Sequence, residues 1–392
     1  MNIKQIIPIS IKNKMLFMHA VFFQRIYGLT NKIKKQVLFE SFDGKQYSDN
    51  PKAVSEMLHE MDPSFQIIWA YNGKYSKKLD MPDYIKTVRV HSKEYYKSIA
   101  TSFAYIRNTQ FESWIVKRNG KQLFFQPWHG DRAIKKILYQ ANPDRKEKVC
   151  DNNVVDYCIS GSVFGTNLFR EAFKFGGDVL EIGCPRNDIL LSNRCLDTEK
   201  LVKEKLNISP STRVLLYAPT FRDSNLFNQE SSIDIKRVVD ELENKTSQKW
   251  VCLIRAHSNV ANGINIDLSE SMIDVSGLGD AADLLCATDF LITDYSTIGT
   301  DYILRRKPVV LAIFDKEDYE KNSRQFSVIP EDTGLLTAQT NEELIKIIQN
   351  TNDEEYEKHC DYALNYYQTK ETGKSACIIA GLIIDKYNVL YS

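Results

Sequence analysis

Residues 290–297 read FLITDYST, an apolar run that ends in a cluster of hydroxyl and carboxylate side chains. The run Phe290–Thr293 has the length and composition of a buried strand, and Thr297–Leu304 has the spacing of a helix. A strand that leads through a short turn into a helix is the repeating unit of a parallel sheet with helices on its faces. This stretch therefore predicts an α/β fold.

The same unit recurs along the chain and restarts after Asn187-Asp188. The other predicted strands are 66–71, 86–90, 103–107, 123–126, 157–160, 179–182, 214–218, 250–255 and 308–314. Helical patterns lie between them at 234–243, 281–286 and 341–349. Strands that alternate with helices form parallel sheets covered on both faces. The simplest architecture is two α/β units joined near residues 186–210, with the site in the cleft between them.

Length and composition support two folded domains. The 392 residues are 43% hydrophobic and 26% charged, which is too apolar for a disordered chain and too long for one comfortable core. The 51 basic residues balance the 51 acidic ones, so no global charge points to nucleic acid. The eight cysteines are scattered without a Cys-x-x-Cys pair, which indicates reduced thiols in a cytosolic protein.

The amino-terminal segment carries its own charge pattern. Residues 1–38 contain seven Lys or Arg and no acidic residue, and an apolar stretch occupies Met15–Phe23. That stretch is too short to span a bilayer, which needs about 20 residues. Two interpretations remain: an amphipathic segment on an anionic membrane surface, or a first helix packed on the core. We expect the divisions 1–36 (basic membrane-associating segment), 37–190 and 191–370 (two α/β domains), and 371–392 (carboxy-terminal helix).

His129 lies in the most informative loop. The segment Gln126-Pro127-Trp128-His129-Gly130-Asp131 follows a predicted strand, so it lies at the carboxyl end of the sheet, where α/β folds bind ligands. A glycine beside the histidine lets a ligand approach, and an imidazole takes a proton from a hydroxyl at neutral pH. These features predict a general base.

A second strand ends at Arg255-Ala256-His257. The Arg255 guanidinium suits phosphate oxygens, and His257 suits charge that develops as a phosphodiester bond breaks. Ser296 and Thr297, with Asp301 one turn later, form a helix start that either binds a pyrophosphate or serves as an ordinary N-cap.

Other known motifs are missing from the sequence. It contains no Gly-x-Gly-x-x-Gly, no Walker phosphate loop, no His-Glu-x-x-His and no Gly-x-Ser-x-Gly. It offers no metal-ligand spacing either, so we expect no cofactor. Two ways to neutralise the donor pyrophosphate remain open: the helix start with Arg255, or a divalent cation that bridges the phosphates.

Five segments in order carry a resemblance: 126–131, 183–188, 217–222, 251–257 and 291–301. With Val37–Ser41 and Tyr47–Pro51 before them, the chain resembles the CDP-glycerol glycerophosphotransferases, which include teichoic acid primases and polymerases and capsule enzymes. The resemblance extends to about Gly334. It implies a GT-B-like fold of two Rossmann-like parallel-sheet domains with a cleft between them.

The resemblance also implies roles for residues. His129 is expected to deprotonate the acceptor hydroxyl, in a loop shaped by Trp128, Gly130 and Asp131. The expected contacts to the CDP-alditol donor are Arg186, Pro219, Thr220, Arg255, His257, Ser296, Thr297 and Asp301. Asp131 is further expected to raise the basicity of His129 or to contact the alditol.

The implied reaction moves glycerol phosphate, or a related alditol phosphate, from CDP-glycerol or CDP-ribitol to a hydroxyl of a lipid-linked acceptor or growing polymer. CMP leaves, and the product is teichoic acid or capsule polymer made at the cytoplasmic face of the membrane by a peripheral protein. Two alternatives remain open: a GT-B glycosyltransferase or epimerase that uses a nucleotide sugar, and a non-catalytic membrane scaffold.

Overall fold

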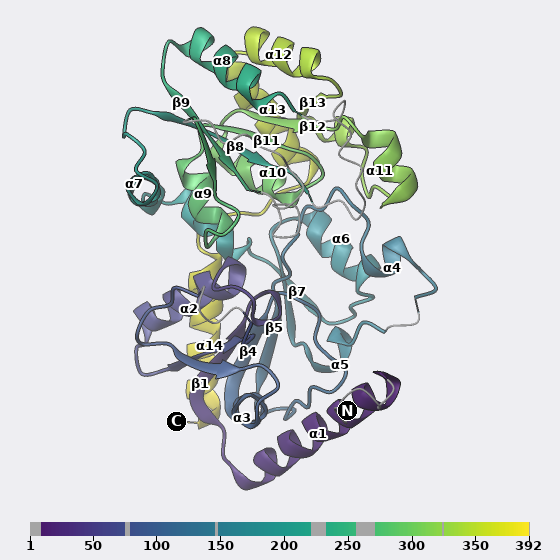
Figure 1. The fold of residues 1–392 in the computed structure, drawn as a ribbon. Coiled ribbons are helices and arrows are strands. Elements are labelled where there is room, and N and C mark those ends of the chain that lie inside the picture. Colours follow the sequence, from purple (N-terminus) through teal and green to yellow (C-terminus); the bar gives the residue numbers. More distant parts are fainter. Residues whose placement is uncertain are drawn as a thin grey trace, which may run out of the picture.

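The computed structural model contains two parallel sheets, one in each half of the chain (Figure 1). It describes residues 9–74, 79–145, 148–220, 233–255, 271–323 and 325–391. The first sheet has the order β3-β2-β1-β4-β5-β6-β7 and the second has the order β10-β9-β8-β11-β12-β13. The predicted double α/β fold, with a GT-B-like arrangement of two sheets, is confirmed.

The strands of the first sheet are β1 (Lys34–Glu40), β2 (Gln66–Tyr71), β3 (Lys86–Arg89), β4 (Ser102–Arg107), β5 (Leu123–Gln126), β6 (Tyr157–Ser160) and β7 (Asp178–Glu181). Those of the second are β8 (Arg213–Ala218), β9 (Trp250–Ile254), β10 (Met272–Asp274), β11 (Phe290–Thr293), β12 (Val309–Ala312) and β13 (Leu336–Ala338). Every predicted strand is present. The prediction missed β1, β10 and β13, because β10 and β13 are only three residues long and β1 begins with two lysines of the basic segment.

The α-helices are α1 (Ile9–Thr30), α2 (Asp49–Met61), α3 (Lys93–Thr101), α4 (Leu138–Ala141), α5 (Asp151–Val154), α6 (Val163–Ala172), α7 (Arg194–Lys205), α8 (Ile235–Thr246), α9 (Ala281–Ala287), α10 (Thr297–Tyr302), α11 (Lys316–Asn322), α12 (Asn341–Asn350), α13 (Asp353–Tyr366) and α14 (Ser375–Tyr391). The 3-10 helices are η2 (Phe42–Gly44), η4 (Pro185–Leu191), η6 (Ile303–Arg305) and η7 (Pro330–Thr333). The predicted helical segments correspond to α8, α9, α10 with η6, and α12.

Strand β1 shows why the first sheet is covered on both faces. Val37, Leu38 and Phe39 are all fully buried. Because successive side chains point to opposite faces, Val37 and Phe39 join a core with Trp69, while Leu38 joins a second core that includes Tyr95. An uninterrupted apolar run of this kind is typical of a parallel strand between two helical layers.

Helix α14 returns from the second half of the chain to the first sheet (Figure 1). Ala376, Ile379, Ala380 and Ile383 of this helix are buried in the same core as Val37 and Phe39 of β1. The predicted carboxy-terminal helix is therefore an integral layer of the first domain, next to α2.

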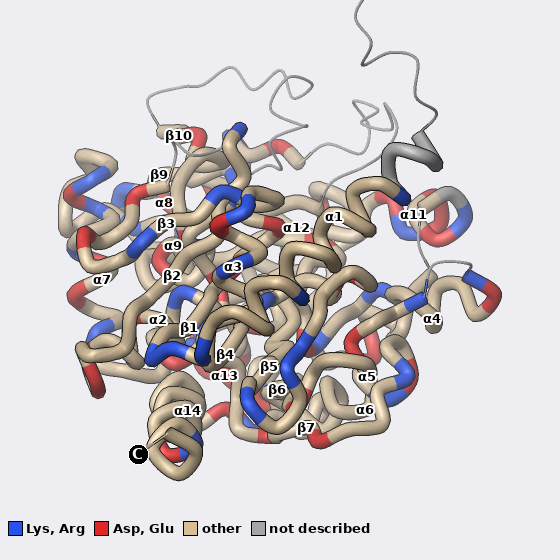
Figure 2. The backbone as a smooth tube through the Cα atoms, turned by 90° about the horizontal axis from the view of Figure 1, so that it is seen from below, with Lys and Arg blue, Asp and Glu red and all other residues tan. Residues whose placement is uncertain are grey.

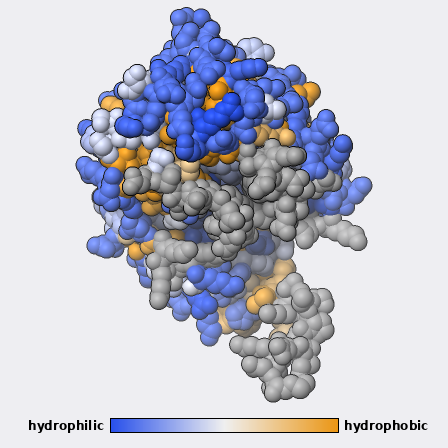
Figure 3. Space-filling model, turned by 45° about the horizontal axis from the view of Figure 1, so that its top comes forward, coloured by the Kyte–Doolittle hydropathy of each residue, from blue (hydrophilic) through white to orange (hydrophobic). Residues whose placement is uncertain are grey.

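Helix α1 packs one face on the first domain. Ala20 lies in the core with Tyr96, and the Gln24 side chain donates to the carbonyl of Trp114 (3.0 Å) and accepts from the amide of Val116 (2.9 Å). Figure 2 shows basic residues, and no acidic ones, along the described part of α1. The outer face of the second domain is largely hydrophilic, with scattered apolar side chains (Figure 3). The interpretation of α1 as a packed first helix thus holds for one of its faces.

Candidate functional site

His129 follows β5 in a strained loop between two aromatic rings. The preceding residue, Trp128, has a φ of 44°, which is a costly left-handed conformation for a bulky side chain. The imidazole centroid lies 4.1 Å from the Trp128 ring and 5.2 Å from the ring of Phe42, which also has a positive φ. Strained residues of this kind persist only where surrounding contacts hold them, and they gather at functional sites.

The His129 ring has a defined tautomer. Its Nδ1 lies 2.7 Å from the carbonyl oxygen of Asn108, and a carbonyl can only accept, so Nδ1 carries the proton. Burial lowers the pKa of His129, against smaller raising effects of this hydrogen bond and of the Asp49 carboxylate. The ring is therefore neutral at pH 7, with Nε2 as the atom that accepts a proton. A general base requires this arrangement.

Two buried amides hold the backbone of the loop. Asn50 Nδ2 donates to the carbonyls of Trp128 (2.6 Å) and Pro127 (3.2 Å). Gln126 Oε1 accepts from the amide of Trp128 (2.9 Å), and its Nε2 donates to Asp151 (2.7 Å). Both amide residues are fully buried. Because buried hydrogen bonds are costly to lose, this frame keeps the strained turn in place.

Asp131 anchors the other end of the loop to the residues at the end of β6. Its carboxylate accepts from the Ser160 hydroxyl (2.9 Å), the Gly161 amide (3.0 Å) and the Ser162 hydroxyl (2.6 Å). The described residues thus occupy both carboxylate oxygens at the carboxyl end of β6. The predicted shaping of the loop by Asp131 fits these contacts. The predicted effect of Asp131 on the basicity of His129 and its predicted alditol contact both stay predictions.

A buried charge cluster joins the two domains at Asp301. Asp301 Oδ1 accepts from Arg132 Nη2 (2.9 Å) and Asn187 Nδ2 (3.1 Å), while Arg186 Nε donates to Oδ2 (2.9 Å). Arg132 also pairs with Glu371 (3.0 Å). These two arginines hold the pKa of Asp301 below its usual value despite its burial. Asp301 and Arg186 therefore form an internal link between the domains, and their predicted contacts to the donor stay predictions.

The start of α10 meets the His129 loop. A Cβ placed on Gly130 would lie 3.3 Å from the Thr297 methyl, so the two predicted segments are in contact across the domain boundary. The Ser296 hydroxyl accepts a hydrogen bond from the amide of Ile298 (3.4 Å) and so caps the helix. An N-cap was one of the two interpretations of this helix start, and a pyrophosphate site was the other. The geometry thus brings His129 and Thr297, from separate sheets, to one place.

The second-domain residues form a further group at the ends of β8 and β9. The amide and hydroxyl of Thr220, which follows Pro219, donate to Asp294 (both 3.0 Å). Arg255 donates to the carbonyls of Leu278 (2.8 Å) and Gly279 (3.3 Å), and burial lowers the pKa of its guanidinium. His257 lies outside the described residues, so its predicted role stays a prediction.

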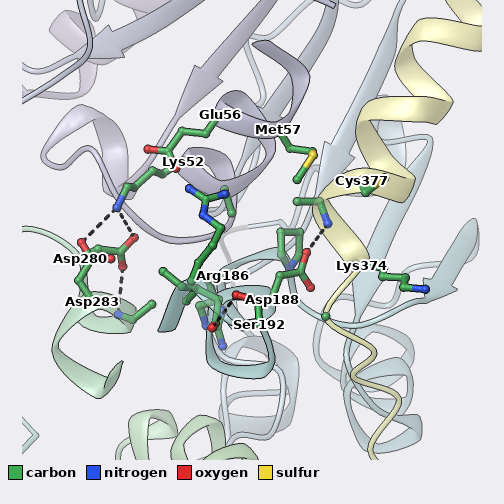
Figure 4. Close-up of a pocket in the computed structure, with 17 residues that line it drawn as sticks. Lys52, Glu56, Met57, Arg186, Asp188, Ser192, Asp280, Asp283, Lys374 and Cys377 are labelled. Carbon is green, nitrogen blue, oxygen red and sulfur yellow. Dashed lines mark hydrogen bonds and ion pairs between the residues drawn. The ribbon is translucent and has the colours of Figure 1, made fainter. Parts of the chain in front are cut away.

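A cavity of about 170 Å³ lies between α2, η4 and α14 on one side and α9 on the other (Figure 4). Lys52 spans it, with Nζ 3.2 Å from Asp283 and 3.6 Å from Asp280. Arg186 lines this cavity too, and its Nη1 is a buried nitrogen with no hydrogen-bond partner among the described residues. The cavity therefore adjoins the domain junction that Arg186 and Asp301 form. The predicted cleft between the domains has this cavity as one part.

Several members of the site escaped the sequence analysis. Asn50 and Asn108 position His129, and Arg132 and Glu371 belong to the junction, yet none was predicted as a site residue. Asn50 stands in the segment Tyr47–Pro51 that contributed to the family resemblance, which was the one available signal. Within the described residues, no group of three or more His, Cys, Asp or Glu side chains is arranged to hold a metal ion.

Known proteins are similar to this chain in both sequence and structure. A teichoic acid poly(glycerol phosphate) polymerase of Staphylococcus epidermidis is 32% identical over 319 residues, which is 77% of this chain and 44% of that protein. A teichoic acid glycerol-phosphate transferase of Staphylococcus aureus is 31% identical over 334 residues, 81% of this chain and 84% of that protein. The chain thus spans less than half of the first relative and most of the second.

The solved structure of the wall teichoic acid polymerase TagF superposes with a TM-score of 0.81 at 27% identity, covering 97% of both chains. The S. aureus MnaA–UDP co-structure is more distant and shows the fold alone: its TM-score is 0.52 at 14% identity, over 92% of this chain and 98% of that chain. The family described as CDP-Glycerol:Poly(glycerophosphate) glycerophosphotransferase matches residues 21–385. The chain belongs to this family.

Proposed function

We propose that the protein transfers glycerol phosphate from CDP-glycerol to a hydroxyl of a lipid-linked acceptor or growing polymer, releasing CMP, in teichoic acid synthesis. The observation that carries the proposal is His129: a half-buried, neutral imidazole whose Nδ1 proton is held by the Asn108 carbonyl, in the loop that meets the start of α10. Relatives named as glycerol-phosphate polymerases and transferases support the substrate.

The chemistry needs few parts. The acceptor hydroxyl gives its proton to His129 Nε2 while its oxygen attacks the phosphorus that bears glycerol. The new P–O bond forms as the P–O bond to CMP breaks, and CMP departs with the electron pair. Catalysis then consists of positioning the two substrates and neutralising the phosphate charge. We assign the latter to Arg255, His257, Ser296 and Thr297, with Trp128, Pro219 and Thr220 shaping the donor site.

Glycerol is the favoured alditol. Relatives named for glycerol phosphate match at 29–32% identity, whereas a ribitol-phosphate primase and a ribitol-phosphate polymerase match at 24% and 26%. A solved TagF variant soaked with CDPG also belongs to the glycerol group. CDP-ribitol is therefore the comparison donor in an assay of CMP release. The same assay, run with and without a chelator, tests whether the reaction requires a divalent cation.

The decisive experiment measures CMP release from CDP-glycerol and CDP-ribitol with a lipid-linked acceptor. We expect release from CDP-glycerol by the wild type and a loss of at least about 100-fold in His129→Ala, since general bases contribute 10²–10⁴-fold. His257→Ala is expected to lose activity as well. If the wild type releases UDP from nucleotide sugars and no CMP from either donor, a glycosyltransferase replaces this proposal. If the wild type releases neither CMP nor UDP, the non-catalytic scaffold replaces this proposal.

Membrane association belongs to the same proposal, at the cytoplasmic face. The face of α1 that points away from the core carries a stripe of exposed apolar residues: Met15, Met18, Phe22, Ile26 and Leu29. Leu29 is 87% exposed and Met18 is 63% exposed, although both are fully apolar. Lys14, Arg25 and Lys32 flank the stripe. An apolar face edged by cations suits the surface of an anionic bilayer.

No helix among the described residues is long and apolar enough to cross a membrane. Binding to vesicles tests the surface mode instead. We expect co-sedimentation with phosphatidylglycerol vesicles, weaker binding to phosphatidylcholine vesicles, and loss of binding in Met18→Asp/Phe22→Asp. Leu201→Asp is the matched control, because Leu201 is 64% exposed on α7, far from α1 (Figure 1). Equal binding of the control and the double variant would contradict the assignment.

A further inference from the structure

Asp49 and Asn50 begin α2 directly beside the loop that carries His129. Asn50 is fully buried and Asp49 is 8% exposed. Asp49 has a φ of 65°, a left-handed conformation that aspartate adopts more readily than most residues. This turn directs the two neighbouring side chains to different parts of the His129 environment.

Asn50 uses its whole side chain to connect the loop with η4. Its Nδ2 donates to the carbonyls of Trp128 (2.6 Å) and Pro127 (3.2 Å), and its Oδ1 accepts from the amide of Arg186 (3.0 Å). The Trp128 carbonyl belongs to the peptide bond that leads into His129. Any movement of Asn50 would therefore move the peptide that carries the imidazole.

Asp49 reaches the imidazole through Asn108. Asp49 Oδ1 accepts from Asn108 Nδ2 (3.0 Å), and the Asn108 carbonyl accepts from His129 Nδ1 (2.7 Å). Asn108 Oδ1 in turn accepts from the amide of Phe42 (2.9 Å), whose ring lies 5.2 Å from the imidazole. Both polar atoms of the Asn108 side chain are thus hydrogen-bonded. These bonds restrain the residue as a whole, including the backbone carbonyl that accepts from His129.

We propose that Asp49 and Asn50 are positioning residues for His129, with Asn50 holding the strained loop and Asp49 holding the ring partner and supplying a compensating negative charge. The inference rests on the proposed function, in which His129 is the general base. Neither residue touches the reacting atoms in this scheme. Each acts through a neighbour, Asn50 through Trp128 and Asp49 through Asn108.

The strain at Trp128 explains why Asn50 is needed. A left-handed conformation costs a non-glycine residue about 1–2 kcal/mol, so an unrestrained Trp128 would relax toward negative φ. That relaxation would rotate the peptide that carries His129. A displacement of about 1 Å at a catalytic group can cost on the order of 100-fold in rate.

The charges around His129 give Asp49 a second role. The Asp49 carboxylate of α2 and Asp43 of η2 raise the pKa of the imidazole, while Arg186 of η4 lowers it. Burial opposes ionisation of Asp49 itself, but its oxygens receive hydrogen bonds from Asn108 and the Asn50 amide, and Arg186 Nη1 lies 3.7 Å away. Without Asp49, Arg186 would be the dominant charge near the ring.

Asn50 is tested with Asn50→Asp and Asn50→Ala in the CMP-release assay. Asn50→Asp keeps an acceptor for the Arg186 amide but removes the donor to Trp128. We expect kcat to fall about 10–100-fold in both variants, with the donor KM within about threefold. Ser48→Ala is the matched control, because the neighbouring buried hydroxyl donates to Gln46 (2.9 Å) and lies outside these contacts. Wild-type kcat in Asn50→Asp would overturn the role of Asn50.

Asp49 is tested with Asp49→Asn, which keeps an acceptor for Asn108 and removes the charge. The acid limb of the pH–rate profile follows the pKa of His129, since only the neutral ring accepts a proton. Removing a nearby negative charge lowers that pKa, so we expect the limb to move about 0.5–1 pH unit toward acid. Asp49→Gly, which tolerates the left-handed backbone, is expected to show the same shift with a lower kcat.

NMR titration of the His129 ring separates this inference from the proposed function. His129 signals are assigned by their loss in His129→Asn, and the folded state of each variant is checked by its melting temperature. If the wild type releases no CMP, the proposed function fails, while an acid shift of the ring pKa in Asp49→Asn still supports the positioning role. An unchanged ring pKa in a folded Asp49→Asn overturns it, whatever the activity.

Discussion

Arg186 and Asp301 form a two-point ion pair between η4 and α10, with Arg186 Nε 2.9 Å from Asp301 Oδ2 and Nη2 3.3 Å from Oδ1. Both side chains are more than nine-tenths buried. The pair connects the end of the first sheet with the second sheet and passes directly beside the His129 loop. It is therefore the point where domain arrangement and site geometry depend on each other.

The first prediction concerns the stability of this junction. Asp301→Asn removes the carboxylate that Arg132 and Arg186 share, so Arg132 keeps Glu371 (3.0 Å) as an ion-pair partner, and Arg186 keeps only Asp49 (3.7 Å). Breaking a buried pair from one side costs about 3–5 kcal/mol of unfolding free energy. Chemical denaturation of Asp301→Asn should show this loss. Lys358→Ala, which breaks an exposed pair with Glu354 (2.7 Å), should cost less than about 1 kcal/mol. Similar losses in both variants would contradict the prediction.

The pH dependence of the junction has a defined sign. The arginines hold the pKa of Asp301 below its unfolded value, so its contribution to stability is present above the unfolded pKa and disappears as pH falls through the folded one. We expect the wild type to lose unfolding free energy in the acid range below pH 4. The stability curve of Asp301→Asn should be flatter there. Parallel curves for the two proteins would show that Asp301 is not the responsible group.

For Asp151 we expect the opposite pH dependence of stability. Burial raises the pKa of this carboxyl to about 6, although Gln126 Nε2 donates to its Oδ1 (2.7 Å). Its stabilising protonated form is fully populated below the unfolded pKa near 4 and is lost as pH rises through 6. Asp151→Asn keeps the acceptor without a charge. We expect this variant to be more stable than the wild type at pH 8, by up to about 3 kcal/mol, from a shift of about two pKa units. The difference should vanish at pH 4, and a constant difference would refute the assignment.

A substitution at Gly165 in α6 is expected to disturb the packing of the loop that carries His129 and Asp131. A Cβ at this position would lie 1.8 Å from Asp131 Oδ1 and 2.6 Å from the Ser160 hydroxyl, so Gly165→Ala would displace the Asp131 carboxylate. Overpacking of this kind costs about 1–3 kcal/mol. We expect a lower melting temperature together with reduced CMP release. Gly176→Ala is the matched control, because a Cβ there meets no atom within 4 Å among the described residues. Unchanged melting in Gly165→Ala would mean that α6 moves aside without cost.

The strands and their terminal loops could be predicted because their signals are local. An apolar run followed by turn residues marks β5 and β11 without any tertiary information, and the carboxyl ends of parallel strands share one edge of a sheet. His129 and Thr297 were therefore identified as site residues from their place after a strand. Their contact through Gly130 required no further motif, only the apposition of the two sheets.

The partners of these residues could not be predicted in the same way. Arg132 stands next to Asp131 in a segment that gave it no distinguishing signal, yet it pairs with Asp301 and with Glu371, 169 and 239 residues away. Asn50 and Asn108 are ordinary polar residues by sequence. Their importance comes from complete burial, because a buried amide must find partners for every polar atom, and those partners are the loop of His129 and its neighbours.

By itself, the sequence determined the double α/β architecture, the loops at the strand ends and the basic apolar character of the first helix, because periodicity and composition report local burial. Only the tertiary structure decided which ring nitrogen of His129 carries the proton and which face of α1 remains exposed. It also decided that Asp301 binds two arginines between the domains. Those properties depend on distances between segments far apart in the chain. Electrostatic and hydrogen-bond energies change steeply with such distances, and no local pattern encodes them.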